Sequence, residues 1–133
     1  MKQSKIVLSA LLLLCVCSAF TRKDKVEFDV VYAYGISSSF TDSTVYYTDI
    51  QLLDSVRLDK NKFLPQREVY AYQLKNYLES KKGLKNRTCM MYFSKSKMKL
   101  VKDFNKTVVH YKRNKTLLQQ VNAKDFRFTK PEE

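Results

Sequence analysis

Apolar residues at every second position in the segment Lys25 to Tyr34, KVEFDVVYAY, with Glu27 and Asp29 on the opposite face at its start, predict a β-strand with one buried face. The polar stretch from Gly35 to Thr44 that follows predicts a long loop. An extended pattern resumes at Val45, so we expect the two strands to pair as an antiparallel hairpin. The side chains expected on the apolar face of the first strand are Val26, Phe28, Val30, Tyr32 and Tyr34.

The clearest helical pattern spans Gln66 to Gly83. Its apolar positions recur at the i, i+4, i+7 and i+8 spacing that places side chains on one helix face. Gly83 suits the position just after the helix, where a left-handed backbone conformation often ends it. The residues of the predicted stripe are Tyr70, Leu74, Tyr77 and Leu78.

Residues 88–93, TCMMYF, carry apolar side chains on both faces, which indicates a central strand covered on both sides, or at least a well buried one. Ser94 and Ser96 are both suitable caps for a helix that follows. That helix presents a single apolar stripe, and its lysines fall mostly outside it. The stripe consists of Met98, Val101, Phe104, Val108 and Tyr111.

Alternation returns at Asp125 to Thr129 and predicts a last strand, at an edge of the sheet because it is charged. The order of elements is then β-β-α-β-α-β. The last strand–helix–strand unit should be a right-handed crossover, which makes its two strands parallel. The sequence therefore predicts an α+β fold: a single small two-layer sandwich, with a mixed sheet and two helices packed on one face.

The first residues have the organisation of a secretory signal peptide. Lys2 and Lys5 are positive, an apolar run too short to span a membrane follows, and small residues precede Phe20. We therefore predict a signal peptide over residues 1–19 and a single α+β domain over residues 20–133. The protein is expected to be exported, either periplasmic or secreted, with no transmembrane segment after signal removal.

Two other interpretations of the same residues remain open. They could form a buried N-terminal helix, or they could direct acylation of Cys17, as in a bacterial lipoprotein. A bulky valine just before Cys17 fits the second interpretation poorly.

The formal net charge is +12 at pH 7, which favours acidic partners such as an envelope component or a protein with an acidic surface. The basic residues are spread along the chain with no block of five or six together, so we expect no nucleic-acid partner. The alternative is that positive charge only keeps the domain soluble.

The residues Lys95, Ser96, Lys97 and Lys99 form the candidate anion-binding site. Lysines at the start of a helix oppose its dipole, and a phosphate, sulfate or carboxylate bound there would relieve both the free N–H groups and the like charges. No glycine-rich phosphate loop accompanies these lysines, and the alternative is an ordinary solvated helix face.

Cys89 is the one cysteine outside the predicted signal peptide. A catalytic cysteine needs a base, and the only histidine, His110, falls on the polar face of its predicted helix, away from the strand. We therefore expect a buried cysteine that behaves as a small hydrophobic residue, or an intermolecular disulfide if it is exposed. No catalytic residue, metal site or cofactor is predicted, because one cysteine and one histidine make no zinc set.

Four segments occur in order behind the predicted signal peptide: VYYTDIQLLDS, FLPQREVYAYQLKNYL, RTCMMYFSKSKMKL and DFRF. Together they resemble a group of small exported proteins of Bacteroidetes that has no established activity. The resemblance implies a bacterial envelope or secreted setting and assigns no role to individual residues. It also draws attention to Ser43 and Ser55, whose Asp-Ser-Thr and Asp-Ser-Val contexts are similar to the O-glycosylation pattern of that phylum.

Three functions follow as hypotheses. The first is a non-enzymatic exported domain that binds a protein or an envelope component. The second is an anion-binding module that recognises acidic glycan, lipid or phosphate groups through the basic helix start. The third is a small hydrolase, for which no Gly-x-Ser-x-Gly turn is present in the sequence.

Overall fold

Strand β1 (Tyr32–Ser38) is the middle of the sheet in the computed structural model, which describes residues 27–132. One edge of β1 pairs along its whole length with β4 (Thr88–Ser94), in the antiparallel sense. Its other edge pairs with β2 (Thr44–Thr48) and β3 (Gln51–Leu52), also antiparallel. β5 (Leu117–Val121) runs parallel to β2, so the mixed sheet ends in β4 on one side and β5 on the other.

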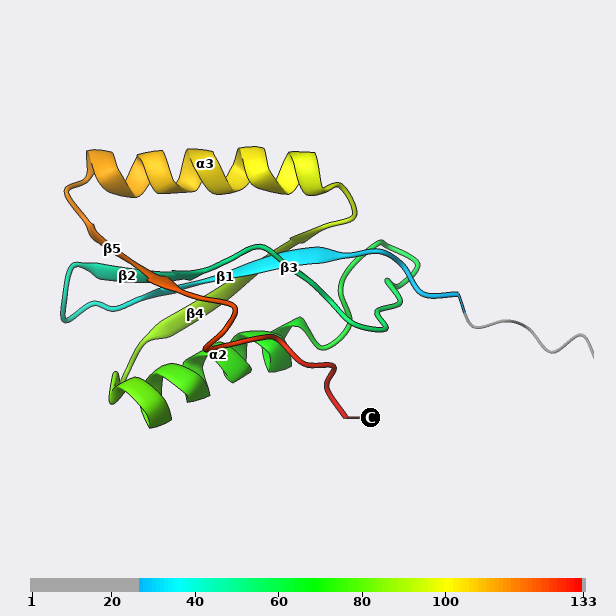
Figure 1. Ribbon diagram of the computed structural model, residues 1–133, viewed down its shortest axis with the longest axis horizontal. Coiled ribbons are helices and arrows are strands. Elements are labelled where there is room, and N and C mark those ends of the chain that lie inside the picture. The colour runs from blue at the N-terminus through cyan, green and yellow to red at the C-terminus, as the bar shows by residue number, and fades with distance from the viewer. Residues whose placement is uncertain (1–26, 133) are drawn as a thin grey trace, which may run out of the picture.

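Helices α2 (Arg67–Lys82) and α3 (Lys97–Arg113) lie on opposite faces of this sheet (Figure 1). Two cores result, because Ala33 of β1 packs under α2 whereas Tyr34 and Ile36 pack under α3. The predicted α+β class with a mixed sheet and two helices is confirmed. The prediction that both helices cover one face is wrong, since β1 carries apolar side chains on both faces and needs cover on both.

The first strand lies further along the chain than its alternation predicted. Phe28 and Val30, expected on its buried face, are 51% and 55% exposed, whereas the neighbouring Val31 is fully buried. Gly35 lies inside β1 and does not begin a loop, so the connection to β2 shortens to residues 39–43. The two-sided apolar run from Val31 to Ile36 decides the position of this strand, because it fills both cores.

β4 is an edge strand, not the central strand that its apolar composition predicted. Met91 is buried and Cys89 half-buried on the face toward α2, but Met90 on the other face is 42% exposed. The apolar pattern identified a strand, but Met91 is the single buried residue of β4, and the pattern could not show which edge of the strand is paired.

Helix α2 agrees with its predicted span from Gln66 to Gly83. In α2 the predicted residues Tyr70, Leu74 and Leu78 are buried, and the helix ends at Gly83, with φ 66° and the Leu84 N–H donating to the Leu78 carbonyl at 2.9 Å. Its end is therefore the left-handed glycine that the sequence predicted.

In α3, Ser96 is the cap, and its side chain accepts a hydrogen bond from the Lys99 N–H at 3.3 Å. The apolar stripe differs at its start from the predicted one. Leu100 is buried against the sheet, whereas Met98 is 77% exposed. His110 is exposed, as the helical periodicity predicted.

The last strand is Leu117–Val121, and the prediction of a strand over Asp125 to Thr129 is wrong. Phe126 and Phe128 are nevertheless buried in the core under α2. The buried Gln51 side chain holds their backbone, donating to the Phe126 carbonyl at 3.0 Å and accepting from the Phe128 N–H at 2.9 Å. The pairings of β4, β1, β2 and β5 make β4 and β5 parallel, as the crossover rule predicted.

The predicted signal peptide, residues 1–19, and the alternative acylation site Cys17 lie outside the described residues. Within residues 27–132, neither helix has the length and apolar character needed to cross a membrane.

Candidate functional site

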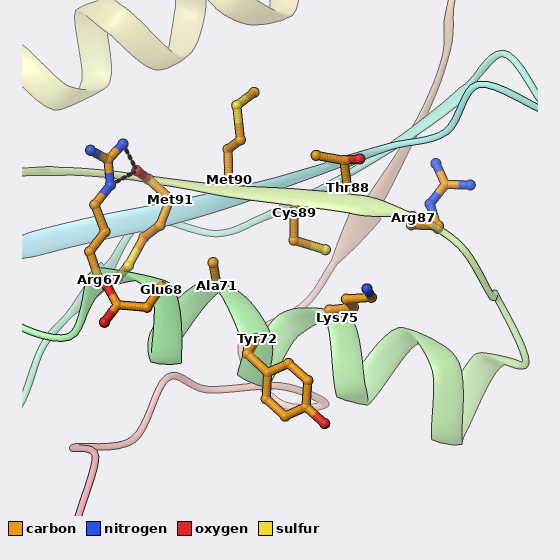
Figure 2. A pocket seen from close by; sticks show the side chains of 10 residues that line it. All are labelled: Arg67, Glu68, Ala71, Tyr72, Lys75, Arg87, Thr88, Cys89, Met90 and Met91. Carbon is orange, nitrogen blue, oxygen red and sulfur yellow. Dashed lines mark hydrogen bonds between the residues drawn. The ribbon is translucent and has the colours of Figure 1, made fainter. Parts of the chain in front are cut away.

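A groove of about 540 Å³ runs between α2 and the edge strand β4 (Figure 2). Arg67, Ala71 and Lys75 recur every four residues along α2, so they lie one turn apart along the same helix face. Ala71 leaves the floor of the groove open because its side chain is a single methyl group. The complete lining comprises Arg67, Glu68, Ala71, Tyr72, Lys75 and residues 87–91.

The outer edge of β4 presents backbone groups to this groove. The Met91 carbonyl accepts hydrogen bonds from Arg67 Nε at 3.0 Å and Nη2 at 2.6 Å, so it points away from β1. In an antiparallel pair, the N–H and C=O of one residue point to the same side, and successive residues alternate. Cys89, Met91 and Phe93 therefore direct their backbone groups outward.

The pairing partner of Met91 supports this assignment. Gly35 lies opposite Met91 in the register of β1 and β4. Its N–H donates to Thr48 Oγ1 at 2.8 Å, on the side of β1 that faces β2 and β3. Gly35 and Met91 therefore form a non-hydrogen-bonded pair of the antiparallel ladder. The backbone N–H and C=O of Met91 point away from β1, toward the open edge of the sheet.

Positive charge borders the groove at both ends. The Arg67 guanidinium stacks over the Phe93 ring at 5.6 Å from its centroid, and Lys75 lies near Cys89. The ion pairs within residues 27–132 are Arg87–Asp42 and Lys95–Asp29, so neither Arg67 nor Lys75 has a carboxylate partner there. Glu68 is the single acidic residue of the lining.

Arg87 closes one end of the groove with a buried guanidinium. It forms an ion pair with Asp42 at 3.0 Å, donates to Ser37 Oγ at 3.0 Å and to the Thr44 carbonyl, and stacks over the Tyr46 ring at 4.8 Å. The residue therefore ties the start of β4 to β1 and to the start of β2. Sequence reasoning missed it, because nothing local distinguishes Arg87 from the solvated basic residues around it.

Cys89 points into the groove and is half-buried (Figure 2). Burial raises the pKa of its thiol, and a Ser37 hydrogen bond and the charges of Arg87 and Lys75 only partly oppose this. His110 lies on α3, beyond the other face of the sheet, so it cannot act as a base for this thiol, as the sequence predicted. A raised pKa leaves little thiolate at neutral pH and does not suit a nucleophile.

The predicted anion site is partly engaged within the protein. Lys95 Nζ pairs with Asp29 Oδ1 at 3.1 Å, and Ser96 already caps the helix. The Leu58 N–H and then Lys95 lower the pKa of Asp29, so this carboxylate stays ionised to a lower pH than an isolated aspartate does. Lys97 lies 5.8 Å from the Tyr32 ring centroid.

Anion binding at this helix start therefore stays a prediction. We expect Glu substitutions at Lys95, Lys97 and Lys99 to reduce retention of the protein on a heparin matrix, because these residues surround the first turn. A matched reversal of the three lysines within residues 81–85 should have a smaller effect. Equal loss of retention in both variants would show general charge attraction and no site.

The two predicted O-glycosylation residues also stay predictions. Ser43 is exposed between Asp42 and Thr44, both of which contact Arg87. Ser55 has a left-handed backbone, with φ 51°, and its hydroxyl donates to Asp54 Oδ1 at 3.0 Å. The two serines thus lie in different loops with different local structures.

No group of three or more His, Cys, Asp or Glu side chains suited to a metal ion occurs in the part of the chain that the structure describes. No protein-family model, curated protein or solved structure matches the chain. The chain is therefore characterised by its own geometry: a small α+β domain whose sheet has one helix on each face and an open edge at β4.

Proposed function

We propose that this protein is an exported, non-enzymatic domain that binds a partner protein in the groove between α2 and β4. The observation that carries the proposal is the groove itself, which combines apolar side chains, outward backbone groups and cations without carboxylate partners. Concave sites of this size with a few convergent polar groups are typical binding sites.

The position of the groove also supports binding. An open edge strand is a surface at which other chains pair, and natural proteins usually protect it with charges, prolines or a covering element. β4 contains no charged residue and no proline among its seven residues, TCMMYFS. The export part of the proposal rests on the sequence of residues 1–19 alone.

A display selection with random twelve-residue peptides tests this function. We expect the purified protein to select peptides that bind saturably and whose affinity falls at least about tenfold in an Ala71→Tyr variant. The new ring would fill the floor of the groove, which is open at Ala71. The affinity would be measured by titration calorimetry.

An Asn76→Tyr variant is the matched control, because residue 76 lies on the exposed side of the same helix. It should bind the selected peptides as the unmodified protein does. Circular dichroism would check that both variants keep their helices. Selected peptides that bind the Ala71→Tyr protein equally well would show that the groove is not the binding site, and the proposed function would be wrong.

A further inference from the structure

We propose that the groove takes an extended acidic segment of a partner protein, which adds to β4 as a further β-strand of the sheet. This inference rests on the proposed function and specifies the chemistry of the partner. Strand addition to an exposed sheet edge is a common mode of peptide recognition: backbone hydrogen bonds supply affinity, and pockets for alternate side chains supply specificity.

The backbone of β4 is ready for such a partner. Cys89, Met91 and Phe93 direct their N–H and C=O groups outward at every second position, which is the spacing that an added strand requires. Of these groups, the hydrogen bonds found among residues 27–132 engage the Met91 carbonyl alone, through Arg67. An incoming strand would replace the guanidinium at that carbonyl, and the released Arg67 would be free to meet a carboxylate.

The side chains of an added strand would alternate between two surfaces. On one side lies the groove floor with Ala71, Cys89 and Met91. On the other side lies Met90, which is exposed beside the α3 face of the sheet. Both surfaces are apolar at the centre of β4, so we expect an apolar residue at the centre of the bound segment.

Charge defines the flanking positions. The Arg67 guanidinium lies over the Phe93 ring and Lys75 lies near Cys89, so the two cations mark opposite ends of the groove (Figure 2). Eight residues of helix separate them by about 12 Å. Four residues of a strand cover about 13 Å. Two acidic side chains four residues apart, with the apolar residue midway, therefore match the two cations.

A second copy of this protein fits the groove less well. The segment from Lys85 to Lys97, which includes β4, contains no acidic residue and has basic residues at both ends. Pairing β4 with β4 would bring these cations toward Arg67 and Lys75 of the other copy. Like charges facing each other across strands are destabilising, so an acidic partner is favoured.

The probe for this inference is an acetylated and amidated heptapeptide, Val-Glu-Thr-Val-Thr-Glu-Val, whose glutamates and central valine share one face. We expect it to shift the amide resonances of Cys89, Met91 and Phe93 and to slow their exchange with solvent. Its binding should weaken at least about tenfold when lysines replace both glutamates. The full chain is used, and its resonances are followed by NMR titration.

Two comparisons make the test specific. N-methylation of one alternate set of peptide amides should abolish binding, whereas N-methylation of the other set should be tolerated, because only one set faces β4. An Arg67→Glu, Lys75→Glu double variant should prefer the lysine peptide. A Lys102→Glu, Lys112→Glu variant carries the same change in net charge on α3 and should keep the original preference.

The outcomes separate this inference from the proposed function. If neither heptapeptide binds, or if both N-methylated sets bind equally well, strand addition is wrong. Display-selected peptides that lose affinity in the Ala71→Tyr protein would still support binding in the groove. In the absence of peptide, the protein could instead form concentration-dependent dimers in which the amides of Cys89, Met91 and Phe93 exchange slowly with solvent. This result would identify a second copy as the occupant of the groove and overturn the inference.

Discussion

Replacement of Arg87 by methionine is expected to lower the free energy of unfolding by about 3 kcal/mol. The guanidinium is buried and donates to the carbonyls of Ser37 and Thr44 as well as to Asp42. Methionine keeps apolar contact with the Tyr46 ring but leaves these acceptors without their donor. Urea denaturation of the full chain, followed by circular dichroism, measures the change.

Two other variants show how the loss is distributed. Arg87→Lys keeps the charge but cannot reproduce the forked geometry, so it should recover only part of the stability. Asp42→Asn should cost less than Arg87→Met, because the Asp42 side chain is 44% exposed and water can replace part of the contact. Equal costs for Asp42→Asn and Arg87→Met would indicate that the ion pair, and not the carbonyl contacts, makes Arg87 important.

The contacts of Asp42 with Thr44 and Arg87 also make the stability of the fold depend on pH in the acidic range. The Thr44 N–H and then Arg87 lower the pKa of Asp42 below its ordinary value. Because the pKa of Asp42 is lower in the folded protein, the ionised carboxylate stabilises the fold at pH values above its unfolded-state pKa, which is near 4. This stabilisation is lost as the pH falls through the folded-state pKa. The Asp42→Asn protein should therefore lose less stability than the unmodified protein between about pH 5 and pH 2.

Local patterns in the sequence predicted the helices well, because their signals are local. The stripe of Tyr70, Leu74 and Leu78 with Gly83 at the end identified α2 from one segment of chain. The Ser96 cap was similarly visible. The first strand was placed too early because polar and apolar residues alternate over residues 25–30. The residues of this region that fill the two cores lie instead between Val31 and Ile36.

The arrangement of layers depended on contacts between distant residues. An apolar run such as TCMMYF has the same composition at an edge as in the centre of a sheet, so the open edge of β4 could not be read from it. The last strand was misplaced for a similar reason. Phe126 and Phe128 alternate like strand residues, but the Gln51 side chain, far away in sequence, takes the place of a strand partner.

No pattern in the sequence predicted the groove. It is formed by α2 and β4, whose contact depends on β1 lying beneath the helix. Arg87 and Arg67 looked like ordinary basic residues, and only their contacts with β1, β2 and Met91 distinguish them. The spacing of Arg67 and Lys75 was visible, but no pattern indicated which strand they would face.

Substitution of alanine for Gly35 is expected to destabilise the protein by about 2 kcal/mol. A Cβ atom at this position would lie 2.7 Å from Leu74 Cδ2 and 3.1 Å from Phe128 Cζ. Both side chains are buried, so neither can move into solvent to make room. The lower unfolded-state entropy of alanine offsets only part of this cost. Urea denaturation gives the measured value.

A double-mutant cycle with Leu74 tests the cause. Leu74→Ala alone leaves a cavity in the core under α2, but in the Gly35→Ala protein it also removes the overlapping atom. The double variant should therefore be more stable than the sum of the single changes predicts, by about 1 kcal/mol or more. Strict additivity would show that α2 does not press against β1 at Gly35.

Gly83→Ala separates this steric effect from backbone strain. Gly83 has φ 66°, but no atom lies within 4 Å of a Cβ added there, so its cost should be independent of Leu74. The position of Gly35 also connects stability with the groove. Because the close contact at Gly35 sets how near α2 lies to the sheet, Gly35→Ala should move α2 outward and weaken groove-binding peptides, whereas Gly83→Ala should leave their affinity unchanged.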